Sequence, residues 1–370
     1  MPVPMLDLRA QYRRIKAEID GAVAEVFESQ GFIGGPKVEG LETAIAQFLG
    51  AKHAIGVASG TDALLLLLKA KGIGAGDEVI TTAFSFFATA GAIANVGATP
   101  VFVDIEPDTF NIDVTQIESR ITKRTRAVIP VHLFGQCADM APIMDLAATH
   151  GLFVIEDAAQ ALGAQYKGRP AATLGHAAAI SFYPTKNLGG AGDGGMVVCR
   201  DEALAERVRL LREHGADSTY HHALVGANSR LDALQAAVLL VKLPHLDSWN
   251  DQRRANAAYY AERFARMPGV VAPIERAENR HVYHQYVIRL PKRDAARELF
   301  SRQNVGCAVF YPSPLPLQPC FQQLGYTEAD FPHAVQASRE VLALPIYPEL
   351  TRAQQDEVIA AVTQHIQALP

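Results

Sequence analysis

The chain has 370 residues and a formal net charge of −5, with 49% hydrophobic and 20% charged residues. Such a composition is typical of a compact globular protein and excludes a disordered or collagen-like chain. Because this length exceeds what one hydrophobic core usually supports, we expect one large and one smaller domain. The mild acidity provides no basic surface for nucleic acid or for an anionic membrane.

The four cysteines, Cys137, Cys199, Cys307 and Cys320, lie far apart and form no C-x-x-C pair. This spacing argues against both a disulfide scaffold and a zinc ribbon. The first residues, MPVPMLDLRAQYRR, lack the apolar core of a secretory signal. We therefore expect a cytoplasmic protein.

An uncharged stretch, residues 79–103, is long enough in principle to cross a bilayer. It is interrupted by several polar residues, by Gly97 and by Pro100, and β-rich ends flank an alanine-rich middle. This pattern favours a buried strand, helix and strand over a membrane span.

Between residues 52 and 200, short β-rich segments alternate with segments of helical composition, which predicts an α/β fold with a mainly parallel sheet. Ligands of such sheets bind outside the carboxyl ends of the strands, so the residues that follow each strand are candidates for chemistry. The expected strands are HAIGVAS, EVITTA, TPVFVDI, RAVIPVHL, LFVIEDAA, AAAISF and MVVCR, and the expected helices are TDALLLLLKAKG, 86–96 and APIMDLAATHG.

Beyond residue 200 the pattern changes to long helices, the second of which is interrupted at Pro244. We expect a boundary near Trp249, which divides the chain into a large domain, 1–249, and a smaller C-terminal α+β domain, 250–370. The smaller domain would contain a strand in HQYVIRLP, a helix over 292–304, the segment GCAVFYP and two further helices.

The segment SFYPTKNLGG places a single lysine, Lys186, in a turn between a strand and a glycine-rich loop. A loop lysine is usually only a solvated charge, but the apolar flank here would lower its pKa, and a neutral amine can form a Schiff base with a carbonyl. The glycines of residues 190–195 match G-x-G-x-x-G. A strand follows them where a dinucleotide site needs a helix, so we reject that interpretation.

Two further strand ends carry candidate ligands. Asp157 ends the strand in VIEDAAQ; it could cap a helix, but it also suits an anion that keeps a ligand's ring nitrogen protonated. Residues 59–62 (SGTD) open a helix, where capping and a phosphate site are both compatible with the side chains. A lysine, an aspartate and a helix amino terminus are together what pyridoxal phosphate requires.

Several motifs resemble, in order and spacing, those of the DegT/DnrJ/EryC1/StrS family of sugar aminotransferases. They are SGTDAL, VIEDAAQ, SFYPTKNLGGAGDGG and GANSRLDALQAA, and the likeness extends from LDLRAQY near the start to LALPIYPELT near the end. The resemblance implies a fold-type I, pyridoxal-phosphate-dependent homodimer that acts on nucleotide-linked keto sugars in amino-sugar biosynthesis.

The resemblance also implies a role for each motif residue. Lys186 and Asp157 would be the catalytic residues: Lys186 binds the cofactor and moves the proton, and Asp157 pairs with the pyridine nitrogen. Asn228 would reach the phosphate from the neighbouring subunit, so that the two subunits share their active sites. The cofactor-binding residues would be Gly60, Thr61, Asp62, Phe86, Asp157, Gln160, Ser181, Lys186 and Asn228.

The implied reaction has two halves, in which L-glutamate leaves its nitrogen on the cofactor and the sugar ketone is then aminated. On the sugar side, His222, Phe310 and Tyr311 resemble residues of members that aminate C3 of UDP- or dTDP-linked sugars. Relatives have histidine where this chain has Phe310 or Pro316, and the loss of a polar group would suit an uncharged deoxyhexose.

Several alternatives stay open. The enzyme could aminate a 4-keto sugar or dehydrate its substrate, although the dehydrating branch has histidine in place of Lys186. A non-catalytic regulator is disfavoured by Lys186 and by the net charge of −5. His222 could instead lie in a solvated turn. We expect no metal site, because His281 and His284 have no further candidate ligand nearby in the sequence.

Overall fold

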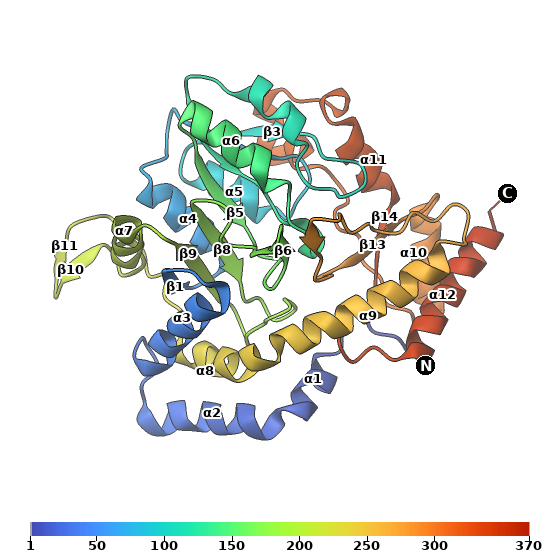
Figure 1. The fold of residues 1–370 in the computed structure, drawn as a ribbon, viewed down its shortest axis with the longest axis horizontal. Helices are drawn as coiled ribbons and strands as arrows, with labels where there is room; N and C mark the ends of the chain where they lie inside the picture. The colour runs from blue at the N-terminus through green and yellow to red at the C-terminus, as the bar shows by residue number, and fades with distance from the viewer. Residues whose placement is uncertain (1, 370) are drawn as a thin grey trace.

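A seven-stranded sheet forms the centre of the computed structural model, which describes residues 2–369 (Figure 1). Its strands are β1 (His53–Val57), β2 (Glu78–Thr82), β3 (Thr99–Val103), β4 (Thr125–Ile129), β5 (Phe153–Asp157), β8 (Ala177–Ser181) and β9 (Gly195–Cys199). They lie in the order β1-β9-β8-β5-β4-β2-β3. All run parallel except β9, which is antiparallel to both of its neighbours. The predicted α/β fold with a mainly parallel sheet is confirmed.

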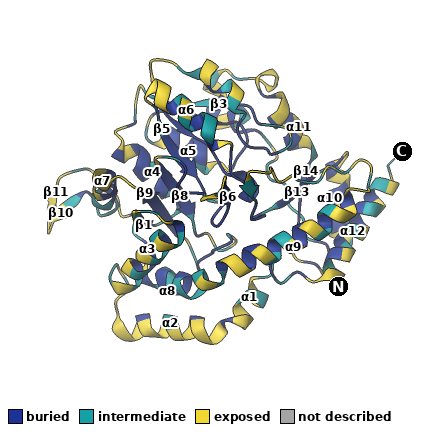
Figure 2. Ribbon diagram, in the orientation of Figure 1, coloured by how far each residue is buried: buried dark blue, intermediate teal, exposed yellow. Residues whose placement is uncertain are grey.

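Helices cover both faces of the sheet, which explains why its strands are apolar throughout rather than alternating. Figure 2 shows the strands buried between helices whose outer sides are exposed. One face carries α4 (Gly60–Ala70), α5 (Ala88–Asn95) and α7 (Glu202–Arg212). The other carries α3 (Pro36–Leu49), α6 (Met140–His150) and α8 (Ala233–Lys242), with α2 (Lys16–Ser29) packed outside α8.

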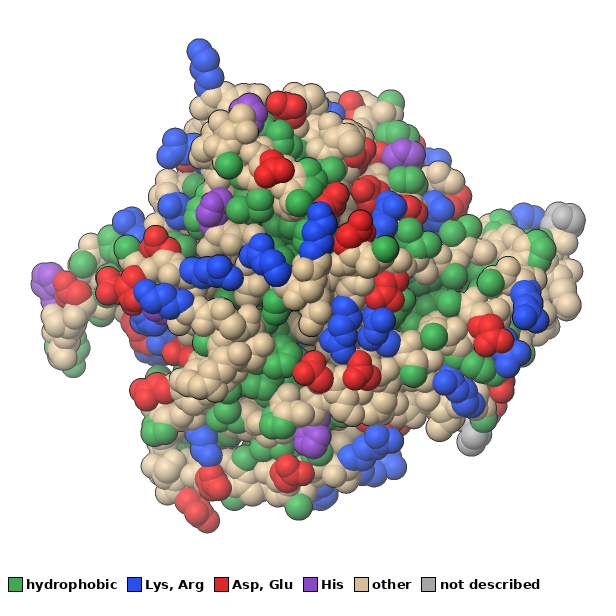
Figure 3. All heavy atoms as spheres, in the orientation of Figure 1, with side chains coloured by type: hydrophobic (Ala, Val, Ile, Leu, Met, Phe, Trp, Pro, Cys, Tyr) green, Lys and Arg blue, Asp and Glu red, His purple; other side chains and the backbone are tan. Residues whose placement is uncertain are grey.

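The uncharged stretch over residues 79–103 forms most of β2, all of α5 and all of β3, as its interruptions predict. Among the described residues, no helix has the length and apolar character that a membrane crossing requires. On the face drawn in Figure 3, acidic and basic side chains are interspersed rather than separated by sign.

The C-terminal third packs as a second layered unit. Pro244 lies in a 3-10 turn, Leu243–His245, after which α9 (Leu246–Phe264) runs on as one long helix. The predicted boundary near Trp249 therefore falls inside a continuous helix, and the division into domains stays a prediction. Val3 pairs with Val305 and lies in the same apolar cluster as the C-terminal strands and helices. Those elements are β13 (Tyr286–Arg289), β14 (Val341–Leu344), α10 (Arg293–Arg302) and α12 (Arg352–Gln367). The remaining helix of this unit, α11 (Pro332–Glu340), packs in a different apolar cluster.

The smaller elements connect these layers. They are α1 (Leu8–Arg14), the short strands β6 (Gln165–Tyr166), β7 (Arg169–Pro170) and β12 (Asn279–Arg280), the hairpin of β10 (Ala216–Ser218) and β11 (His221–His222), and further 3-10 turns at Val114–Gln116, Glu118–Arg120, Leu133–Gly135, Leu315–Leu317, Pro319–Leu324 and Glu328–Asp330.

Two glycines let the backbones meet at the carboxyl edge of the sheet. A Cβ on Gly195, where β9 begins, would lie 2.3 Å from the carbonyl carbon of Ser59. A Cβ on Gly60, the first residue of α4, would lie 2.8 Å from Cβ of Ser181, the last residue of β8. The start of α4 is thereby pressed against the end of β8.

We predict that Gly195→Ala destabilises the protein by about 1–3 kcal/mol, because the added methyl group meets backbone that cannot rotate away. The matched control is Gly21→Ala in α2, where a Cβ would meet nothing within 4 Å. This change should be neutral or stabilise by up to about 1 kcal/mol, since alanine favours a helix interior. Urea unfolding of both variants measures the difference; equal midpoints would contradict the close packing at Ser59.

Candidate active site

Lys186 lies in the turn between β8 and β9, on the carboxyl edge of the sheet. Its backbone N–H donates to the carbonyl of Tyr183 at 2.8 Å, which closes the turn. Burial of the side chain lowers the pKa of the Lys186 amine to about 8, and the charge of Asp157 opposes this shift to a smaller extent. A useful fraction of the amine is therefore neutral, and hence nucleophilic and basic, near physiological pH.

Asp157 ends the neighbouring strand, β5, and is only 5% exposed. Its Oδ2 accepts a hydrogen bond from Oγ1 of Thr89 at 2.7 Å, and its Oδ1 accepts one from the N–H of Ala159 at 3.2 Å. These two donors fix the position of the carboxylate. Because β5 and β8 pair side by side, Asp157 and Lys186 lie at the same edge.

Gln160 and Tyr311 join this edge from distant parts of the chain. The Oε1 atom of Gln160 accepts from the N–H of Phe134 at 2.7 Å, and its Nε2 donates to the hydroxyl of Tyr311 at 3.0 Å. Burial raises the pKa of Tyr311, so the phenol stays protonated. The ring of Phe86 lies 6.5 Å from that of Tyr311 and is 58% exposed, which leaves an aromatic face open beside the buried polar groups.

The start of α4 offers donors for an anion. Oγ of Ser59 accepts from the N–H of Asp62 at 3.0 Å, and this bond caps the helix. Among residues 2–369, the N–H groups of Gly60 and Thr61 donate to no other group. Unpaired N–H groups at a helix amino terminus, beside the hydroxyl of Ser181, suit a phosphate.

Asp62 is held by a residue that the sequence did not single out. Its Oδ2 accepts from the hydroxyl of Ser229 at 2.9 Å, and the carbonyl of Ser229 accepts from the N–H of Ala58. This places the segment that contains Asn228 next to the start of α4. The Asn228 side chain is exposed and forms no hydrogen bond within the described chain.

His222 lies away from the other predicted site residues. It belongs to the hairpin of β10 and β11, which projects from the body of the molecule in Figure 1. Its Nδ1 contacts the carbonyl of His214 at 3.1 Å, and Tyr220 at the tip of the hairpin is 94% exposed. A single chain therefore does not bring His222 to Lys186, and its role as a substrate contact stays a prediction.

Two residues that the resemblance assigns to the sugar side, Phe310 and Pro316, are apolar. Phe310 is half-buried, with its ring 5.8 Å from that of Tyr311, and Pro316 is buried. Neither can donate a hydrogen bond to a carboxylate or a hydroxyl group.

The Nδ1 atoms of His281 and His284 are each paired with another protein group. Nδ1 of His281 accepts from the N–H of Tyr283 at 3.0 Å, and Nδ1 of His284 lies 3.2 Å from Oδ1 of Asn187. In the part of the chain that the structure describes, no group of three or more His, Cys, Asp or Glu side chains is arranged to hold a metal ion.

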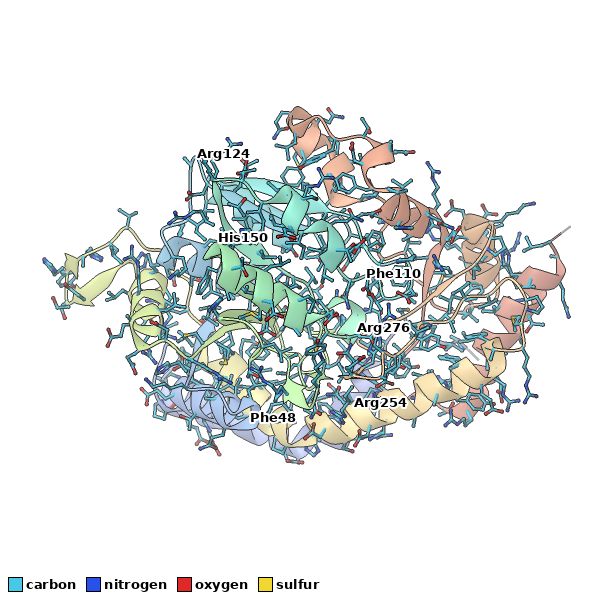
Figure 4. The ribbon with its side chains drawn as sticks, turned by 45° about the horizontal axis from the view of Figure 1, so that its top comes forward. Phe48, Phe110, Arg124, His150, Arg254 and Arg276 are labelled. Atoms are coloured by element: carbon cyan, nitrogen blue, oxygen red, sulfur yellow. The ribbon has the colours of Figure 1, made fainter. Side chains whose placement is uncertain are left out.

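A groove of about 780 Å³ lies at the opposite, amino edge of the sheet, lined by Lys71, Lys123 and Phe153 among others. Figure 4 shows Arg124 and His150 near that edge. The groove contains none of the predicted site residues. Those residues follow the carboxyl ends of the parallel strands, which lie at the other edge of the sheet.

Three contacts of this site could not be found in the sequence. Thr89 donates to Asp157, and Ser229 donates to Asp62. Asn187, which follows Lys186, donates to Asn250 and so holds the turn. Ser229 and Asn187 at least lie within the motifs GANSR and SFYPTKN, whereas Thr89 is a lone hydroxyl in an alanine-rich helix.

In the cofactor-free protein, we predict that labelling of Lys186 by an amine reagent reaches half its maximal rate near pH 8, the pKa that burial gives this amine. Asp157→Asn should lower this midpoint, because the lost negative charge no longer stabilises the ammonium form. Asp193→Asn removes a charge from an exposed position in the following loop and should leave the midpoint unchanged. Peptide mass spectrometry across a pH series measures all three; a midpoint near 10.5 would contradict the buried amine.

Comparison with known proteins agrees with this geometry. Three curated relatives cover nearly the whole chain. A "Pleiotropic regulatory protein" of Geobacillus stearothermophilus is 52% identical over 98% of both chains. A dTDP-3-amino-3,4,6-trideoxy-alpha-D-glucose transaminase of Streptomyces venezuelae is 45% identical over 98% of this chain and 96% of its own. A UDP-N-acetyl-3-dehydro-alpha-D-glucosamine 3-aminotransferase of Acidithiobacillus ferrooxidans is 45% identical over 97% of this chain and 96% of its own.

The fold is also that of a solved enzyme structure. The X-ray structure of DesV from S. venezuelae, in complex with a ketimine intermediate, superposes with a TM-score of 0.97 at 44% identity and covers 100% of both chains. The model of the DegT/DnrJ/EryC1/StrS aminotransferase family matches residues 13–363. The chain therefore belongs to the DegT/DnrJ/EryC1/StrS aminotransferase family.

Proposed function

We propose that this protein, a nucleotide-sugar aminotransferase, transfers the amino group of L-glutamate to C3 of a nucleotide-linked 3-keto sugar. The observation that carries the proposal is the buried amine of Lys186, whose pKa is about 8, at one sheet edge with the fixed carboxylate of Asp157. One relative is named a transaminase for a 3-amino sugar and another a 3-aminotransferase for a 3-dehydro sugar, which supports C3 over C4.

The cofactor is pyridoxal phosphate, and the residues at the carboxyl edge fit it. The free N–H groups of Gly60 and Thr61, with Ser181, would hold the phosphate, and Phe86 would cover the ring. Asp157 would face the ring nitrogen and Gln160 the ring hydroxyl. When bound, the cofactor supplies an electron sink and a temporary carrier for the amino group.

The side chains of this protein supply the proton transfers. Neutral Lys186 Nζ takes the α-proton of the amino donor, and burial keeps that amine a base at working pH. Thr89 and the N–H of Ala159 would hold the Asp157 carboxylate toward the ring nitrogen of the cofactor. Each half of the reaction needs a proton transfer at the site of Lys186, so this one lysine serves both halves.

The sugar is an uncharged deoxyhexose in this proposal. The half-buried ring of Phe310 lies beside Tyr311, where a carboxylate-bearing sugar would need a donor, and the buried Pro316 supplies no donor either. Sequence identity does not distinguish the two nucleotides. A relative named for a dTDP-linked sugar and one named for a UDP-linked sugar are both 45% identical to this chain. Competition between dTDP- and UDP-linked 3-keto sugars at equal concentration distinguishes them by the ratio of kcat/KM.

The active form is a homodimer with shared sites in this proposal. Asn228 and His222 are exposed, and neither meets Lys186 within its own chain. A second copy related by twofold symmetry would bring both residues to the site from the partner's surface.

We predict that Lys186→Ala abolishes transamination, because the substitution removes the amine that moves the proton, while the far-UV spectrum and the melting temperature stay those of the wild type. The assay incubates enzyme, L-glutamate and keto sugar and follows the aminated product and 2-oxoglutarate by mass spectrometry. Full activity in the variant would overturn the assignment of the base. A dehydrated product, or no turnover by the wild type, would point instead to the dehydratase or the regulator.

Shared active sites predict complementation between two inactive variants. Lys186→Ala and Asn228→Asp each damage one half of a site, so a mixed dimer would carry one intact site and one doubly damaged site. After unfolding and refolding of an equal mixture, we expect about a quarter of wild-type activity, since half the dimers are mixed and each has one good site. Lys186→Ala mixed with itself is the control, and no recovery in the mixture would show that Asn228 acts within its own chain.

A further inference from the structure

A buried polar cluster behind Lys186 is not used by the proposed reaction. Asn187 follows Lys186 in the chain, and its Nδ2 donates to Oδ1 of Asn250 at 2.7 Å and to the carbonyl of Val282 at 3.1 Å. A backbone carbonyl only accepts, so the Asn187 amide must turn its NH₂ group this way. The Asn250 amide is fixed by the same reasoning, since its Nδ2 donates to the carbonyl of Leu162 at 3.2 Å.

This arrangement determines the protonation of His284. Both protons of the Asn187 amide are already donated, so its Oδ1 can only accept, and the His284 Nδ1 that lies 3.2 Å away must carry the hydrogen. His284 is 5% exposed, and burial holds its pKa well below the ordinary value, with the charges of Lys186 and Arg253 acting in the same direction. The ring is therefore neutral, with its proton on Nδ1.

The segment that carries His284 is itself held firmly against α9. Nη1 of Arg253 donates to the carbonyls of Tyr283, His284 and Ile346 at 3.2, 3.4 and 2.8 Å. On the next position of the helix, Nη1 of Arg254 donates to the carbonyl of His281 at 2.8 Å. Figure 4 shows Arg254 on α9, close to the segment that contains Arg276.

The side chain of Asn250 is held in one position, as that of His284 is. A Cβ on Gly163 would lie 2.4 Å from Nδ2 of Asn250, and Gly163 has a φ of +88°, so only glycine leaves room for this amide. The cluster thus presents two rigid partners, one from α9 and one from the segment before β13, to the residue directly after Lys186.

We propose that His284 is a positioning residue for Lys186: its Nδ1–H holds Oδ1 of Asn187 and so fixes the turn that keeps the Lys186 amine away from water. The proposal rests on the proposed role of Lys186. If the donor is lost, a buried amide oxygen is left without a partner, which is costly enough to shift the turn. The amine would then gain water.

Two substitutions of His284 separate this role from simple packing. In His284→Asn the amide NH₂ occupies the place of Nδ1 and can still donate to Asn187, whereas in His284→Gln it occupies the place of Nε2 and cannot. The measurement is the pH dependence of Lys186 labelling in cofactor-free protein, with exposed Lys123 in the same digest as the control for the reagent.

We expect the labelling midpoint of His284→Asn to stay near that of the wild type, about pH 8. His284→Gln should raise the midpoint by about one pH unit, so that labelling at pH 7 falls roughly tenfold. In the active holoenzyme, His284→Gln should lower kcat roughly tenfold and leave the KM for the sugar unchanged, while His284→Asn rescues kcat.

Equal labelling of the two variants would overturn the proposal, whether both match the wild type or both lose the low midpoint. If His284→Gln does not fold, Asn187→Ala removes the same hydrogen bond from the other side and must raise the midpoint. Labelling needs neither cofactor nor substrate. A wild-type protein that fails to transaminate, yet shows the His284-dependent midpoint, would therefore contradict the proposed function and leave this inference standing.

Discussion

The site depends on the burial of the Lys186 amine. Burial lowers the pKa of this amine, so that part of it is neutral near physiological pH. The nearby Asp157 carboxylate would by itself make the amine more strongly cationic, so burial has to outweigh it. Burial in turn requires a turn between β8 and β9 that does not open. Closely packed backbone at Gly195 and Gly60 holds the sheet side of this turn, and Asn187 holds the other side.

The parallel sheet explains how residues distant in sequence meet at this turn. The start of α4, the end of β5 and the end of β8 bring unpaired N–H groups, a carboxylate and a lysine to one edge, because strands β1, β5 and β8 point the same way. Each element is held by a separate contact: Asp62 by Ser229, Asp157 by Thr89, and the Lys186 turn by Asn187. The C-terminal unit closes the site through Tyr311, which accepts from Gln160.

The sequence predicts the strands of the sheet well, because each is a short, largely apolar run. It could not give the direction of β9, since MVVCR has the same pattern in either orientation. It also missed β14, where the apolar residues VLAL follow α11 without a turn signal. Lys186 and Asp157 stand out through their positions after strands. His284 did not, because its partner Asn187 lies 97 positions away in the chain.

In the proposed function, Lys186 binds pyridoxal phosphate, and the cofactor then accepts the nitrogen of L-glutamate. The most direct test is the visible absorption spectrum of the purified protein with pyridoxal phosphate, recorded before and after addition of L-glutamate. We expect a band of lysine-bound cofactor that bleaches when glutamate is added and is absent in Lys186→Ala. Failure of the wild-type protein to form such a band would contradict the role of Lys186.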